Sequence, residues 1–106
     1  MRKKFEIPKH FELLGKDFTV KRTMDLLPKS NNGVVGQILH DFGTIELQGS
    51  SPTYPVSEDS MNETYLHEVT HAILSAMESK LTSDEKFVNL FAKHLYQVLK
   101  TSDYSK

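Results

Sequence analysis

Two histidines and a glutamate in the second half of the chain are spaced so that their side chains could act together. They belong to the run His67-Glu68-Val69-Thr70-His71. On a helix, residues four positions apart have Cβ atoms about 5–6 Å apart, so both imidazoles can reach one zinc ion, each about 2.0–2.1 Å from it. Glu68 is rotated by roughly 100° from His67 and lies beside the ion, where a carboxylate can take a proton from zinc-bound water. The spacing predicts hydrolytic chemistry.

The competing interpretation of this run is an ordinary amphipathic helix with two surface histidines and a glutamate between them. Given the composition of this chain of 106 residues, chance would produce the spacing only about 0.02 times. The two interpretations differ in whether a third ligand is within reach, because a catalytic zinc site has three protein ligands and one open position.

The third ligand is not expected on the same helix. A third histidine six residues after His71 would be residue 77, which is Met77. Glu78 shares the face of the histidines, but it lies about 10.5 Å along the helix axis from His71, which is too far to share an ion. A ligand from a second helix is therefore needed.

Two carboxylates stand at the start of that second helix. Asp84 and Glu85 follow a break in the pattern, so either could complete the site. Glu85 could instead be the last residue of a capping box that begins at Thr82 and bond back to the Thr82 backbone. Asn89 lies one turn after Glu85 on the same face, where it could orient a ligand or be only a surface amide.

Strand patterns precede helix patterns along the chain. Residues 11–14 and 18–22 flank a short turn, and residues 34–39 and 44–48 flank a second turn at 40–43, which predicts a β-hairpin. Residues 44–48 alternate polar and apolar side chains, which is typical of a half-buried strand. The segregation of strands from helices predicts an α+β fold with its strands at about 11–48.

The helices are expected at about 59–79 and 83–100, the first with a packing side and a metal side. The expected core stripe of the first helix consists of Leu66, Val69, Ile73, Ala76 and Met77. A wide apolar face is expected on the second helix, with Phe87, Leu90, Phe91 and Val98.

Composition narrows the class of protein. With 106 residues, 38% of them hydrophobic, the chain predicts one domain spanning residues 1–106. With 13 basic and 14 acidic side chains, the chain has no excess of positive charge that would indicate binding to nucleic acid or to an anionic membrane. Because it contains no cysteine, any metal ligands are expected to be histidine and carboxylate side chains. Residues 5–10 interrupt any signal-peptide core, so we expect a soluble cytoplasmic protein, with no signal for an oligomeric state.

The two helices resemble those of a known protease family. Residues 85–92 resemble the E-x-x-A-N-x-F-A segment that follows HExxH in ImmA/IrrE-type metallopeptidases, with Val88 in place of the alanine. Residues 66–74 look like the active-site helix of that family. The whole chain also looks like the short zincin-like proteins encoded by bacteriophages and prophages.

The resemblance implies a small zincin-like domain with a gluzincin-like arrangement. Its implied Zn²⁺ ligands are His67, His71 and Glu85, and Glu68 is implied as general base and acid. We expect zinc-dependent peptide-bond hydrolysis, with a polypeptide substrate pairing along a sheet edge at residues 44–48. By the resemblance, a regulatory protein of phage or host is the expected substrate.

The alternative is a non-catalytic zincin-fold module that binds a protein partner and uses zinc structurally or not at all. Its support is size, because so short a chain has little material for walls around a substrate.

Overall fold

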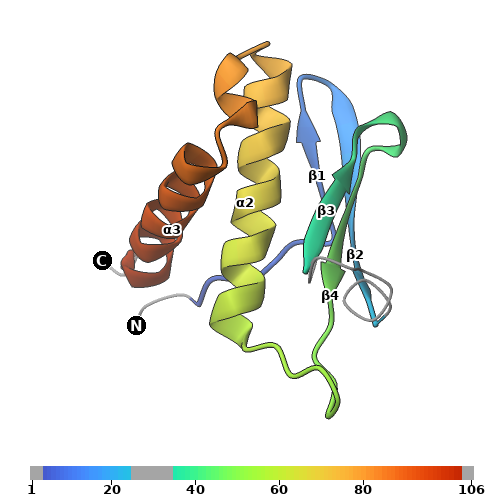
Figure 1. The fold of residues 1–106 in the computed structure, drawn as a ribbon, viewed down its shortest axis with the longest axis vertical. Helices are drawn as coiled ribbons and strands as arrows, with labels where there is room; N and C mark the ends of the chain where they lie inside the picture. Colours follow the sequence, from blue (N-terminus) through green and yellow to red (C-terminus); the bar gives the residue numbers. More distant parts are fainter. Residues whose placement is uncertain (1–3, 25–34, 104–106) are drawn as a thin grey trace.

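A four-stranded sheet and two helices make up the described part of the chain, residues 4–24 and 35–103 of the computed structural model. The elements in chain order are β1 (His10–Leu13), β2 (Lys16–Thr23), β3 (Gly36–Leu39), the 3₁₀ turn η1 (His40–Phe42), β4 (Thr44–Gln48), α2 (Glu58–Ala76), the 3₁₀ turn η2 (Lys80–Ser83) and α3 (Glu85–Thr101). The layers run sheet, α2, α3, with α2 in the middle (Figure 1). The predicted α+β class is confirmed. No helix in the described ranges is long and apolar enough to cross a bilayer.

The sheet consists of two hairpins joined side by side. Its strand order is β1-β2-β4-β3, with antiparallel pairing within each hairpin and parallel pairing between β2 and β4. Gly43, at φ 57°, follows η1 and turns the chain into β4, because glycine adopts left-handed backbone angles without steric cost. The predicted hairpin around residues 40–43 is therefore confirmed.

The predicted sheet edge at residues 44–48 is wrong. β4 lies between β2 and β3, so β3 is the edge strand on this side of the sheet. The parallel register from Thr19 opposite Thr44 to Thr23 opposite Gln48 covers the side of β4 that was expected to be free. Because β4 is central, every residue in it is buried except Glu46, which is half-buried, and the strand is not the half-buried one that its alternation predicted.

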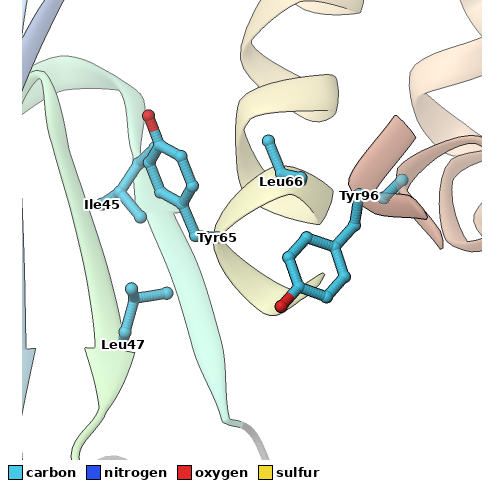
Figure 2. Packing of buried hydrophobic residues seen from close by; sticks show 6 residues of the cluster. Ile45, Leu47, Tyr65, Leu66 and Tyr96 are labelled. Atoms are coloured by element: carbon cyan, nitrogen blue, oxygen red, sulfur yellow. The ribbon is translucent and has the colours of Figure 1, made fainter. Parts of the chain in front are cut away.

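The core lies on both sides of α2. Ile45 and Leu47 of β4 are fully buried against the sheet-facing side of α2, where Tyr65 packs (Figure 2). Leu66, the next residue, points to the opposite side of α2, where Tyr96 of α3 packs (Figure 2). Because consecutive residues of α2 face different layers, α2 does not bury one stripe.

This two-sided burial corrects the predicted core of the first helix. Leu66 is buried and Val69 packs against the core, but Ile73 is 38% exposed, Met77 is 68% exposed and Ala76 is also exposed. Ala72 and Leu74 are buried instead.

The ends of both helices also differ from their expected positions. α2 begins after its cap Ser57 and ends at Ala76 rather than 79, because Glu78 has φ 56° and the chain turns there. α3 begins at Glu85 rather than 83, because residues 80–83 form η2. Of the apolar face expected on α3, Leu90, Phe91 and Val98 are 46–59% exposed, since the buried residues are Val88, Ala92 and Tyr96.

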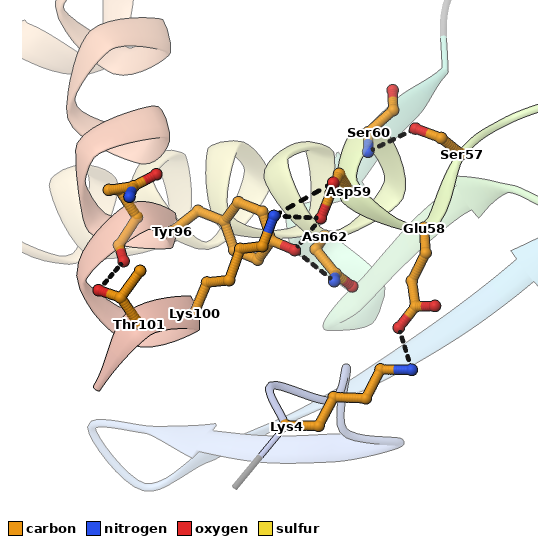
Figure 3. Close-up of polar contacts among 10 residues, drawn as sticks. Lys4, Ser57, Glu58, Asp59, Ser60, Asn62, Tyr96, Lys100 and Thr101 are labelled. Carbon is orange, nitrogen blue, oxygen red and sulfur yellow. Dashed lines mark hydrogen bonds and ion pairs between the residues drawn. The ribbon is translucent and has the colours of Figure 1, made fainter. Parts of the chain in front are cut away.

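A polar network fastens the C-terminal end of α3 to the N-terminal end of α2 (Figure 3). The Tyr96 hydroxyl donates to Asp59 Oδ1 at 2.5 Å and accepts from Asn62 Nδ2 at 3.0 Å. Lys100 Nζ donates to Asp59 Oδ2 at 3.2 Å. The hydrogen bond from Tyr96 and, to a smaller extent, the one from Lys100 lower the pKa of the Asp59 carboxyl. The network fixes the position of α3 along α2.

Gly36 sets the distance between β3 and α2. A Cβ atom at this position would lie 2.4 Å from Thr64 Cγ2, and the Thr64 hydroxyl is held by its hydrogen bond to the Ser60 carbonyl at 2.9 Å. We expect Gly36→Ala to lower the free energy of unfolding by about 1–3 kcal/mol in urea denaturation, as overpacking does. Adding Thr64→Ser, which removes the clashing methyl group, should recover most of that loss. An equal loss in the double variant would contradict this contact as the cause.

Candidate metal centre

Three side chains from two helices converge on one point. Glu85 Oε1 lies 2.9 Å from His71 Nε2, and Glu85 Oε2 lies 3.1 Å from His67 Nε2. The two Nε2 atoms are themselves 3.2 Å apart. Helical spacing places the two imidazoles on one face of α2, and the packing of α3 against α2 brings the carboxylate to them. The three residues predicted as ligands are thus placed together.

The donor set fits a metal ion such as zinc in number, type and spacing. Ligand atoms at 2.0–2.1 Å from a tetrahedral ion lie about 3.3 Å from one another. The two histidine Nε2 atoms are 3.2 Å apart, which is close to that value, and each lies 2.9–3.1 Å from a different oxygen of Glu85. Two imidazole nitrogens and one glutamate oxygen also form a ligand set of catalytic zinc sites. One ligand atom from each of the three residues lies within 4.8 Å of the other two, so these side chains could hold a metal ion.

The start of α3 frees Glu85 to face the histidines. Asp84 is the N-cap of α3, and its Oδ1 accepts from the Phe87 backbone N–H at 3.0 Å. The capping box from Thr82 to Glu85 is therefore wrong, because the helix begins two residues later than that motif requires. The alternative ligand Asp84 is engaged in capping and lies outside the converging group.

Thr82 contacts the site and was not found by sequence reasoning. Its hydroxyl oxygen lies 3.1 Å from His71 Nδ1, on the side of the ring opposite Glu85. Eleven residues separate Thr82 from His71, so no helical period links them. The only sequence cue was a hydroxyl residue in the break between the two helices.

Glu68 is buried beside the converging ligands. It is only 7% exposed and lines a cavity together with His67 and Glu85. Burial, and to a smaller extent the negative charge of Glu85, raises the pKa of Glu68 to about 7. A carboxyl group with a pKa near neutrality can both accept and release a proton under physiological conditions, which suits a general base.

The cavity makes the site accessible from solvent. It has a volume of about 540 Å³ and lies between α2, α3 and the beginning of β3, where Val35 and Gly36 line it. Asn89, the predicted partner of a ligand, is exposed in the same wall, and in the described part of the chain no hydrogen bond joins its amide to Glu85. Two of the three candidate ligands, His67 and Glu85, line this space.

Comparison with protein-family models, curated proteins and solved structures gives no match to this chain.

Proposed function

We propose that this chain is a zinc-dependent metallopeptidase of the zincin type, in which His67, His71 and Glu85 hold the ion. The observation that carries the proposal is the convergence of these three residues beside a cavity that is also lined by the buried side chain of Glu68. An ordinary amphipathic helix with two surface histidines does not require a carboxylate from another helix beside both rings. The family resemblance of the two helices points the same way.

Glu68 performs the proton transfers in the proposed reaction. Zinc held by His67, His71 and Glu85 would polarise the peptide carbonyl and lower the pKa of a bound water. Glu68 would take a proton from the attacking water as the water oxygen bonds to the carbonyl carbon. As the C–N bond breaks, Glu68 passes the proton to the leaving amine nitrogen, which regenerates the carboxylate.

The outer edge of β3 is the proposed docking strand for an extended substrate. Among the described strands, none pairs with this edge. The Gln48 N–H donates to the Val35 carbonyl at 2.9 Å, and antiparallel pairs alternate, so the backbone groups of Gly36 and Ile38 point away from β4. A polypeptide that pairs with them as an added strand runs past the cavity.

A peptide-library digest tests the proposal. Zinc-loaded protein should cleave a proteome-derived peptide library, a chelator should abolish the cleavage, and zinc should restore it. Elemental analysis of the same sample checks for about one zinc per chain. A non-catalytic zincin-fold module, structural zinc included, predicts that no peptide is cleaved by the loaded protein. That outcome would refute the peptidase while leaving the metal centre in place.

A further inference from the structure

The His71 ring is held from both sides by one short segment of the chain. Glu85 approaches Nε2 at 2.9 Å, and Thr82 approaches Nδ1 at 3.1 Å. Thr82 belongs to η2 and Glu85 is the first residue of α3, so residues at the junction of η2 and α3 contact both nitrogens of the ring. The imidazole is 15% exposed, which leaves little room for other partners.

Metal binding at Nε2 places a specific demand on Nδ1. A neutral imidazole carries one proton, and a metal takes the unprotonated nitrogen, so Nδ1 must hold the proton and donate it. The Thr82 hydroxyl has the lone pairs to accept that hydrogen bond. A hydroxyl can also donate, so Thr82 can bond to an unprotonated Nδ1 when Nε2–H faces the Glu85 carboxylate in the absence of metal. A carbonyl or carboxylate could serve only the first state.

His67 lacks a comparable support. Its described polar contacts, with Glu85 and with His71, are both made through Nε2. Within residues 4–24 and 35–103, no hydrogen bond reaches His67 Nδ1. The two histidines of the motif are therefore held differently, and His71 is the one whose ring is oriented before an ion arrives.

We propose that Thr82 is the positioning residue of the metal centre, and that its hydroxyl fixes the tautomer and the orientation of His71. The proposal rests on the proposed metal site and adds a residue to it that touches neither ion nor substrate. Loss of a hydrogen-bond partner of this kind weakens metal affinity by about 10–100-fold.

Zinc affinity measured by competition with a chromophoric chelator tests this role. Thr82→Val keeps the shape but removes the hydroxyl, and we expect about 10–100-fold weaker binding. Thr82→Ser keeps the hydroxyl and should bind close to the parent. Ser79→Ala is the matched control, because Ser79 Oγ accepts from the Leu81 N–H at 3.2 Å and supports the same turn without contacting His71. Its zinc affinity should stay close to that of the parent.

Three outcomes would overturn the role of Thr82. Thr82→Val could bind zinc as the parent does, or Ser79→Ala could lose as much affinity as Thr82→Val, which would mean that the turn alone matters. If Thr82→Val fails to fold, NMR of the zinc-loaded parent decides: the Nδ1 proton of His71 should exchange with solvent more slowly than that of His67, and equal rates would refute the proposal. A parent that binds no zinc would overturn the metal centre and the proposed function together.

Discussion

Glu68→Gln should retain as much zinc as the parent and lose turnover by about 10²–10⁴-fold. Glutamine has nearly the same shape as glutamate but cannot take a proton from water. The three converging ligand atoms belong to other residues, so the substitution leaves them in place. Elemental analysis measures the zinc, and kcat/KM on a peptide selected from the library measures the chemistry.

Glu58→Gln provides the matched control for this experiment. It makes the same chemical change in the first turn of α2, outside the cavity, where Glu58 pairs with Lys4 at 2.9 Å (Figure 3). Its turnover should stay near that of the parent, since Glu58 lies outside the cavity and an exposed ion pair contributes little to the stability of the fold. Loss of zinc from Glu68→Gln would identify Glu68 as a ligand, and full activity would require a different general base.

Glu85→Ala should abolish tight zinc binding and stop zinc from stabilising the fold. A bound ligand raises the free energy of unfolding by RT ln(1 + [L]/Kd), which is about 2.7 kcal/mol at a hundred times Kd. The melting temperatures of parent and variant should therefore be close without zinc and should move apart as zinc is added. Thermal unfolding across a zinc titration measures this gap.

Asp84→Ala separates the loss of a ligand from the loss of a helix cap. Asp84 caps α3 without joining the site, so its replacement should lower stability by about 1 kcal/mol at every zinc concentration. Curves of Glu85→Ala that stay parallel to the parent in the same way would show that Glu85 is not a ligand.

Local geometry explains why so much of the site was predictable. His67 and His71 are four residues apart on one helix, so their convergence follows from the helical period alone. The turn residues at 40–43 likewise fixed the β3–β4 hairpin, because hairpins form between neighbouring strands. Glu85 was reached through its place in the second helix together with the family resemblance.

Three of the errors concern contacts between residues distant in sequence. The edge strand was misassigned because strand order depends on the pairing of β2 with β4, which no local pattern in either strand reveals. The C-terminal half of the α2 core was misassigned because α3 and the sheet cover α2 from different sides. Thr82 was missed for the same reason, since its role depends on how η2 lies against His71.

The parallel pairing between β2 and β4 also divides the assembly of this chain into early and late steps. Each β-hairpin joins neighbouring strands, and α2, η2 and α3 form one continuous helical hairpin that carries all three ligands and Thr82. The contacts within each β-hairpin are local, and local contacts form quickly. Pairing Thr19–Thr23 with Thr44–Gln48 requires closing a longer loop, whose entropy must be lost before the contacts form. We therefore expect the joining of the two hairpins to be the slow step in completing the sheet that packs against α2.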